Sequence, residues 1–166
     1  MTLEAAAPEP RAAEFAVIAA HFNEIVVRAL VDGACASFTA GGVPTDRVHV
    51  TWVPGAFELP LAARTAASSG RFRAVVCLGA VIRGETAHFD YVAGEAARGI
   101  LDAGVATGVP VVFGVLTTDT MDQAMDRAGG AHGNKGWDAA QAAIRMAQAL
   151  DELRAAPGAA ARGERR

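Results

Sequence analysis

Four short apolar runs alternate with longer segments of helical spacing along this chain. In order, the runs are Phe15–Ala20, Val48–Val53, Ala74–Leu78 and Val109–Leu116. Continuous apolar runs of this length are typical of strands covered on both faces, as in a parallel sheet. Parallel strands need crossover connections, which the segments between them can supply as helices. The pattern therefore predicts an α/β fold, a three-layer flavodoxin-like sandwich around a four-stranded parallel sheet.

The predicted helices have recognisable ends. Asn23 is a suitable N-cap for the first helix, and Thr117–Thr120 offers capping side chains for a short helix that reaches Ala128. The helix that contains His88 is expected to end near Gly104. The final helix follows the glycine-rich loop Gly129–Gly136. Its buried face is expected to consist of Ala143, Met146, Leu150 and Leu153.

The length of 166 residues and the hydrophobic content of 52% favour one domain with a sizeable core. We expect the domain to span residues 15–154. Residues 1–14 would form an N-terminal arm that covers a sheet edge or extends the sheet of a neighbouring subunit. Residues 155–166 are rich in Ala, Gly and Arg, and we expect them to be disordered.

Charge and motif content exclude several classes of protein. The net charge is −3 and the basic residues cluster only at Arg162–Arg166, so no nucleic-acid partner is expected. The N-terminus lacks signal-peptide features, and no apolar run is long enough for a membrane span, which predicts a cytoplasmic protein without a membrane partner. Phosphate-loop, dinucleotide-binding, nucleophile-elbow and metal-ligand motifs are absent. His21, His49 and His132 are therefore interpreted as structural residues.

A polar or glycine-broken segment follows each predicted strand. Parallel strands share a direction, so these segments are expected on one edge of the sheet, where α/β proteins bind ligands. The most informative one is Gly79–Val92, which contains a strand end, a turn and a helix start with His88. Helix N-termini present free backbone N–H groups to anions. We therefore predict an anion-binding active site at this junction.

Several longer blocks then become recognisable as a set. They are Val53–Pro60, Val81–Gly84 with His88–Val92, Gly114–Thr118, and Asp126–Gly129 with Gly133–Gly136. Together with Phe22-Asn23, these blocks closely resemble the 6,7-dimethyl-8-ribityllumazine synthase family. The resemblance implies a transferase of riboflavin synthesis that needs no metal or organic cofactor. Its substrates would be 5-amino-6-(D-ribitylamino)uracil and 3,4-dihydroxy-2-butanone 4-phosphate, and it would release phosphate and water in the penultimate step.

The resemblance also assigns roles to single residues. His88 would be the general acid and base of the reaction, and Phe22 would stack on the pyrimidine ring. Arg127 and the backbone of Glu85-Thr86 would bind the phosphate, with the Glu85 side chain turned to solvent because a carboxylate would repel it. The full set of implied substrate-binding residues is Phe22, Asn23, Ala56, Phe57, Glu58, Ala80, Val81, Ile82, Glu85, Thr86, Phe113, Arg127 and Lys135.

Within this set, Ala56–Glu58 would hold the ribityl chain, and Ala80–Ile82 with Phe113 would line the ring pocket. Lys135 would lie near the pyrimidine or the phosphate. Family sites form between adjacent subunits, so Arg127 and Lys135 would act on a ligand held mainly by the neighbouring chain. The implied assembly is a homopentamer or an icosahedral shell of pentamers, with riboflavin synthase as a candidate partner. Two alternatives stay open: a shell protein without catalysis, and a mononucleotide-binding or flavin-binding module.

Overall fold

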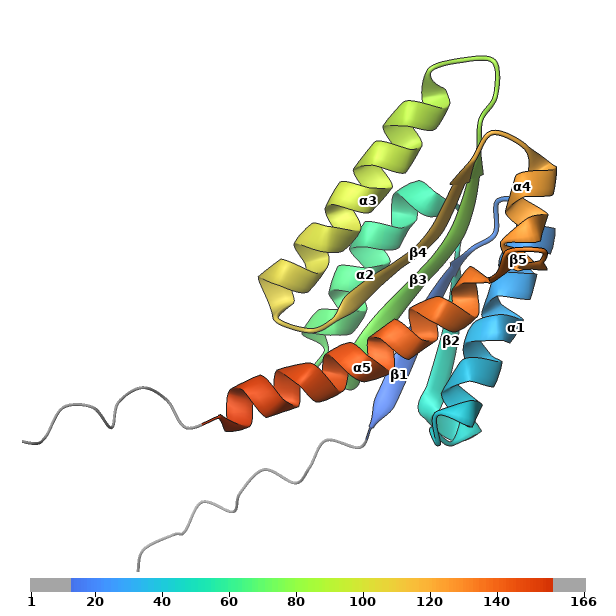
Figure 1. The fold of residues 1–166 in the computed structure, drawn as a ribbon. Helices are drawn as coiled ribbons and strands as arrows, with labels where there is room; N and C mark the ends of the chain where they lie inside the picture. Colours follow the sequence, from blue (N-terminus) through green and yellow to red (C-terminus); the bar gives the residue numbers. More distant parts are fainter. Residues whose placement is uncertain (1–12, 157–166) are drawn as a thin grey trace, which may run out of the picture.

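The computed structural model describes residues 13–156, which form three layers around one sheet (Figure 1). Its strands are β1 (Glu14–Ala20), β2 (Val48–Val53), β3 (Phe72–Ile82) and β4 (Val111–Thr118). Their order is β2-β1-β3-β4, and all neighbouring strands are parallel. The predicted α/β class and four-stranded parallel sheet are confirmed. Strand β3 continues beyond the predicted end at Leu78 because β4 pairs with it as far as Ile82 and Thr118.

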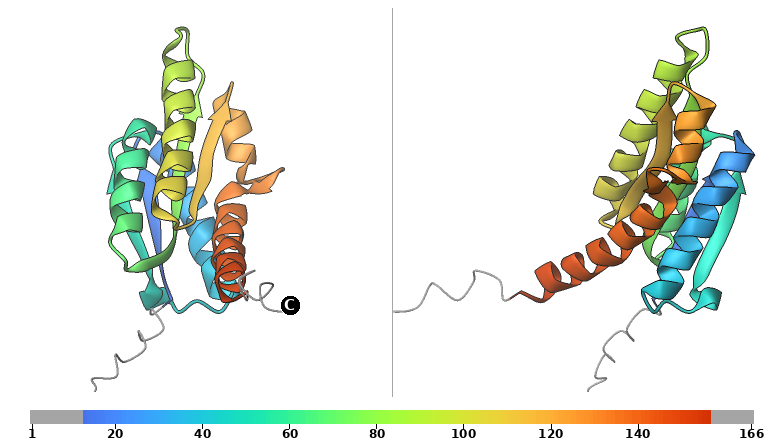
Figure 2. Two further views of the ribbon diagram at one scale, coloured as in Figure 1. Left: turned by 90° about the vertical axis from the view of Figure 1, so that its left-hand side faces the viewer. Right: turned by 45° about the vertical axis from the view of Figure 1, so that its right-hand side comes forward.

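Helices cover both faces of the sheet (Figures 1 and 2). One face carries α1 (Glu24–Ala40), the short α4 (Met121–Asp126) and α5 (Lys135–Ala155), and the other carries α2 (Leu59–Ser68) and α3 (His88–Thr107). Two 3-10 turns, η1 (Thr45–Arg47) and η2 (Ala56–Glu58), flank β2. Helix α3 ends at Thr107, beyond the predicted end near Gly104, because Gly108 takes the left-handed conformation of a C-cap (φ 68°) and its N–H donates to the Gly104 carbonyl (2.9 Å).

Alternating residues of β1 and β3 divide the core into two layers. Phe15, Val17 and Val76 pack on the side of α1 and α5, while Ile18 and Cys77 pack on the side of α2 and α3. Burial raises the pKa of the Cys77 thiol to about 12, so this side chain behaves as a neutral core residue. The sheet centre therefore has apolar contacts on both faces.

The buried face of α5 differs from the prediction. Its buried residues are small, and they are Gly136, Ala139, Ala140, Ala143 and Ala147. Met146 and Leu153, which were expected in the core, are exposed in the single chain. The reason is the close approach of α5 to α1, where a Cβ atom on Gly136 would lie only 1.9 Å from the Leu30 carbonyl oxygen. Small residues permit this contact, and the larger ones lie outside it.

The glycine-rich loop before α5 forms a small antiparallel hairpin of β5 (Ala128–Gly130) and β6 (Gly133–Asn134). Asn134 then caps α5, because its side-chain oxygen accepts from the backbone N–H groups of Gly136 and Trp137. Thr120 forms a capping box with Gln123 at the start of α4, as its sequence position predicts. This helix ends at Asp126, two residues before the predicted end.

Most of the expected N-terminal arm and C-terminal tail, including Arg162–Arg166, lies outside the described residues. Within residues 13–156, no helix is both long enough and apolar enough to cross a bilayer.

Candidate active site

A cavity of about 690 Å³ lies at the carboxyl edge of the sheet, between the β1–α1 turn, η2 and the start of α3. This volume is in the range of small-molecule sites. The cavity brings together nine of the residues predicted for substrate binding and catalysis, namely Phe22, Ala56, Phe57, Glu58, Ala80, Val81, Ile82, Thr86 and His88. Three connections far apart in the sequence therefore meet at one place, as the common direction of the strands requires.

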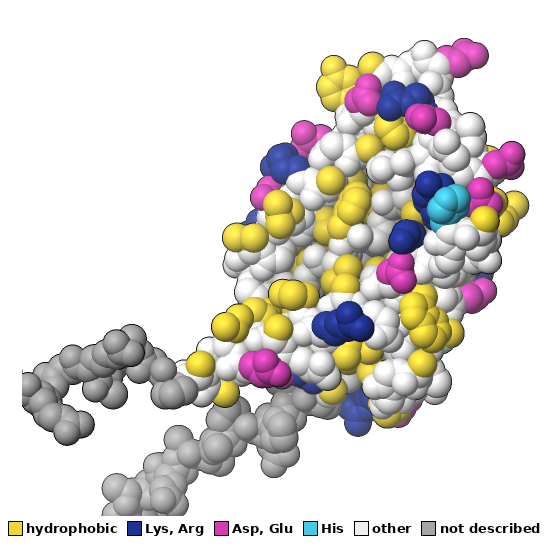
Figure 3. Space-filling view, in the orientation of Figure 1, with side chains coloured by type: hydrophobic (Ala, Val, Ile, Leu, Met, Phe, Trp, Pro, Cys, Tyr) yellow, Lys and Arg dark blue, Asp and Glu magenta, His cyan; other side chains and the backbone are white. Residues whose placement is uncertain are grey.

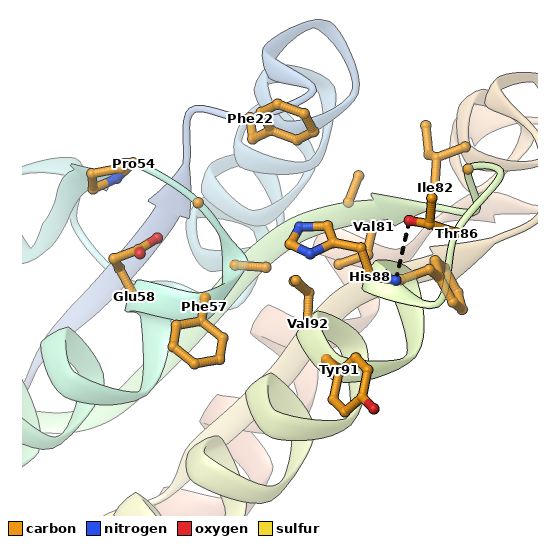
Figure 4. Close-up of a pocket in the computed structure, with 15 residues that line it drawn as sticks. Phe22, Pro54, Phe57, Glu58, Val81, Ile82, Thr86, His88, Tyr91 and Val92 are labelled. Atoms are coloured by element: carbon orange, nitrogen blue, oxygen red, sulfur yellow. Dashed lines mark hydrogen bonds between the residues drawn. The ribbon is translucent and has the colours of Figure 1, made fainter.

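Phe22 forms one side of the cavity although little of the protein covers it. Its side chain is 72% exposed, and Figure 4 shows the ring next to the open space. The turn that carries it lies along the end of β2, because His21 N–H donates to the Val53 carbonyl (2.8 Å) and Phe22 N–H donates to the Pro54 carbonyl (3.1 Å). An exposed aromatic face at a cavity is suited to stacking on a flat heterocycle.

Asn23 is the N-cap residue of α1, as predicted, but its side chain makes no capping hydrogen bond, so the expected capping chemistry is wrong. Its backbone is left-handed (φ 58°, ψ 45°), whereas a side-chain N-cap usually needs an extended conformation. The side-chain amide instead donates to the carbonyl of Ala80 in β3 at 2.8 Å. Asn23 does not line the cavity.

Glu58 enters from η2, the turn that the Pro54-Gly55 break introduces after β2. Gly55 leaves space beside it, since a Cβ atom there would lie 3.1 Å from a Glu58 carboxylate oxygen. In Figure 4 the carboxylate points toward the same open space as the ring of His88. An ionised carboxylate can accept several hydrogen bonds, which suits a ligand rich in hydroxyl groups.

His88 is the first residue of α3. Its backbone N–H contacts the Thr86 hydroxyl at 3.4 Å, and the imidazole extends into the cavity between Phe22 and Val92 (Figure 4). Within the described chain, no protein group forms a hydrogen bond with the ring nitrogens. The imidazole is therefore available to a ligand, and imidazole can both donate and accept protons near neutral pH.

Arg83 holds the turn that leads from β3 to α3. Its guanidinium contacts Asp119 (2.9 Å) and Asp90 (3.5 Å) and lies 4.3 Å from the centroid of the Phe89 ring. The hydrogen bond to Asp119 raises the pKa of Arg83, with a smaller contribution from Asp90. Glu85, in the same turn, is exposed and does not line the cavity, as expected for a side chain turned to solvent.

A second hollow of about 440 Å³ contains the remaining predicted residues, Phe113, Arg127 and Lys135. It lies over β4, where Figure 3 shows Lys and Arg side chains beside an open trough. The Arg127 guanidinium donates to the Gln123 carbonyl (3.0 Å), and the Lys135 ammonium contacts Asp138 (2.9 Å).

Within the single chain, Phe113 and Ala80–Ile82 line different hollows, so the expectation that they line one pocket stays a prediction. Phe113 pairs in register with Cys77, three residues before Ala80 in β3. At the rise of a strand, this places it about 10 Å below the cavity wall.

Comparison with known proteins identifies the family. A family model described as 6,7-dimethyl-8-ribityllumazine synthase matches residues 12–151, which include both hollows. The chain belongs to the 6,7-dimethyl-8-ribityllumazine synthase family. The protein of that name from Syntrophus aciditrophicus (strain SB) is 51% identical over 140 residues, which cover 84% of this chain and 91% of that relative. Membership in this enzyme family confirms the resemblance and does not favour the two non-enzymatic alternatives.

Some residues that line the cavity beside Phe22 were not predicted from the sequence. Pro54, Gly55, Phe89, Tyr91 and Val92 also line it. Tyr91 was within reach of prediction, because it lies three residues after His88 in the same helix and such residues are neighbours on the helix surface.

The three histidines interpreted as structural do not form a site with one another. His21 stacks on Trp52 with a centroid distance of 4.9 Å, and His49 lies 3.2 Å from the Glu14 carboxylate. Across residues 13–156, no group of three His, Cys, Asp or Glu side chains is arranged to hold a metal ion.

Proposed function

We propose that this chain forms 6,7-dimethyl-8-ribityllumazine from 5-amino-6-(D-ribitylamino)uracil and 3,4-dihydroxy-2-butanone 4-phosphate, with the cavity beside Phe22 as the reaction site. Family membership supports the reaction. The observation that supports the location is that Glu58 and His88 extend into one cavity beside an exposed aromatic ring. A polyol chain, a heterocycle and a proton-transfer step each have a suitable partner there.

The pyrimidine would lie between Phe22 and the apolar wall of Ala80–Ile82, because flat rings gain from stacking and from burial. The ribityl chain would then run toward Ala56–Glu58. There the Glu58 carboxylate accepts hydrogen bonds from hydroxyl groups. This orientation brings the exocyclic amine of the pyrimidine toward His88.

His88 would transfer the protons of the condensation. The amine attacks the ketone carbonyl and water leaves, a later step eliminates phosphate, and the ribityl-bearing nitrogen then closes the ring on the remaining carbonyl with loss of a second water. Each step moves a proton to or from a reacting atom, which a free imidazole can do. The phosphate would lie against the Gly84–Thr86 turn, close to the positive end of α3.

A neighbouring copy of the chain would complete the site with its Phe113, Arg127 and Lys135. The need for a neighbour is supported by charge: in the part of the chain that the structure describes, the cavity lining contains no Arg or Lys. A phosphate substrate favours a cationic partner, and Arg can bind it with two parallel hydrogen bonds. The homopentamer, the icosahedral shell, the cytoplasmic location and a riboflavin synthase partner stay predictions.

The direct test mixes both substrates with the protein and follows lumazine formation by its fluorescence. Acceleration over the spontaneous condensation is expected. A reaction no faster than the protein-free mixture would overturn the proposal. Omission of either substrate controls for contaminating fluorescence, and sedimentation of the same sample shows whether the active species is an oligomer.

A further inference from the structure

We propose that Asn23 is a positioning residue: its side-chain amide holds the Phe22 turn against β3 and thereby sets the affinity for the ribitylaminouracil substrate. The inference rests on the proposed function of the cavity. It differs from the role first expected for Asn23, because the side chain is directed to the protein and not to a ligand.

The backbone of Asn23 is unusual. Among residues 13–156, it is the only non-glycine residue with a positive φ, 58°. Asn tolerates this left-handed conformation better than most residues, and such conformations are concentrated at functional sites. At the junction of β1 and α1, the conformation turns the chain sharply directly after Phe22.

The amide of Asn23 replaces a missing sheet contact. The pairing of β1 with β3 ends at Ala19 and Leu78, so Ala80 lies beyond the last paired residue on that side. Ala80 is only 3% exposed, and a buried carbonyl oxygen needs a donor. The Asn23 side chain supplies this donor at 2.8 Å, across 57 residues of sequence.

This contact connects the two walls between which the heterocycle would stack. On the β2 side, the Phe22 turn is held by backbone hydrogen bonds to Val53 and Pro54. On the β3 side, the Asn23 amide bond reaches Ala80, which itself lines the cavity next to Val81. Without the Asn23 amide, the Phe22 turn would be held only by its hydrogen bonds on the β2 side. The distance between the Phe22 ring and the wall formed by Ala80 and Val81 would then vary.

Two substitutions separate the amide from the backbone conformation. Asn23→Gly retains access to the left-handed conformation and removes the amide. Asn23→Asp retains the shape but directs a carboxylate oxygen at the Ala80 carbonyl. We expect KM for the ribitylaminouracil to rise by about 3- to 10-fold in Asn23→Gly, and more in Asn23→Asp, from the loss of one hydrogen bond. KM for the phosphate substrate and kcat at saturation are expected to change less than about twofold, because the amide touches neither the reacting atoms nor the phosphate turn.

Ser37→Ala is the matched control. It removes two part-buried hydrogen bonds of the same helix, far from the cavity: the Ser37 hydroxyl donates to the Trp137 carbonyl (3.0 Å) and accepts from the Gln141 amide (3.0 Å). It should lower stability without changing either KM. An unchanged KM for the ribitylaminouracil in both Asn23 variants would overturn the inference. So would equal increases in both KM values, or a fall in kcat with KM unchanged.

Hydrogen exchange tests the tether without substrate. The peptide that contains Phe22–Val27 should exchange faster in Asn23→Asp than in the unmodified protein, while Ser37→Ala should leave it unchanged. Equal exchange in the Asn23→Asp and unmodified proteins would contradict the inference. This measurement is independent of turnover, so an inactive unmodified protein would overturn the proposed function without deciding the role of Asn23.

Discussion

The two hollows of this chain differ in both construction and charge. The cavity beside Phe22 is formed by three turns at the carboxyl edge of the sheet, and it offers aromatic and apolar walls with one carboxylate and one imidazole. The hollow over β4 lies along an edge strand and contains Arg127 together with the ion pair of Lys135 and Asp138. The first suits a flat, hydroxyl-rich heterocycle, and the second suits an anion.

Under the proposed function, one substrate needs each kind of surface, and a single chain holds the two surfaces apart. Catalysis would therefore depend on assembly, with the hollow of one chain facing the cavity of the next. This arrangement also explains why Phe113 is 44% exposed in the single chain despite its size. An exposed aromatic side chain next to two cations is typical of a surface that receives a partner.

The largest effect is expected from His88→Ala. Loss of the general acid and base should reduce kcat for lumazine formation by about 10²- to 10⁴-fold. The fold should be retained, because His88 is exposed and its imidazole extends into the open cavity. Circular dichroism checks the fold, and His132→Ala, in the hairpin turn outside both hollows, is the matched control. A kcat within about twofold of the unmodified protein would remove His88 from the mechanism.

Mixing two inactive variants tests whether the hollows belong to one site. His88→Ala damages only the cavity, and Arg127→Met damages only the hollow. If neighbouring chains share a site, co-refolding the two variants in equal amounts should restore about a quarter of the sites. Each shared site has an intact cavity in half of the cases and, independently, an intact hollow in half of the cases. The measurement is kcat/KM of the mixture against each variant refolded alone. Activity equal to the mean of the separate variants would show that both hollows act within one chain.

Gly136→Ala should weaken the contact between α1 and α5, the helices next to the cavity and the hollow respectively. The new Cβ atom would lie 1.9 Å from the Leu30 carbonyl oxygen, so α5, which begins at Lys135, must move away from α1. Overpacking of this kind lowers the free energy of unfolding by about 1–3 kcal/mol. Urea denaturation measures it. Gly94→Ala, where nothing lies within 4 Å of the added atom in α3, is the control and should not be destabilising.

The smallest effect is expected from Glu14→Gln, at the amino edge of the sheet and far from both hollows. A hydrogen bond from Arg71 at 2.5 Å lowers the pKa of the Glu14 carboxyl, and the charges of Arg71, His49 and Arg47 lower it further. A lowered folded-state pKa contributes stability above the ordinary pKa of 4.5, and this contribution is lost as the pH falls through the folded-state value.

Melting temperatures of the Glu14→Gln and unmodified proteins should therefore differ slightly near neutral pH and converge in acid. Lumazine formation should be unaffected, since this edge contacts neither hollow. A difference in melting temperature that grows as the pH falls below 4.5 would contradict the assignment of this stability to the lowered pKa of Glu14. A loss of activity would show that the amino edge influences the cavity, against the separation described above.

Sequence periodicity was sufficient for the architecture. Continuous apolar runs marked the strands within a few residues, because two-sided burial leaves a local signature that does not depend on distant contacts. It also placed Phe22, Glu58 and His88 on one edge, since parallel strands share a direction. Motif blocks indicated the family, which the comparisons confirm.

Tertiary structure decided what depends on contacts between distant segments. The length of β3 depends on its pairing with β4, and the small buried face of α5 depends on how closely α1 approaches. The separation of Phe113 from Ala80 follows from strand register, which a single sequence does not specify. The Asn23 amide looked like a helix cap, yet it bonds a carbonyl 57 residues away because the left-handed backbone turns it toward β3. The sequence determined which elements form and which edge they share; packing and register determined which side chains meet there.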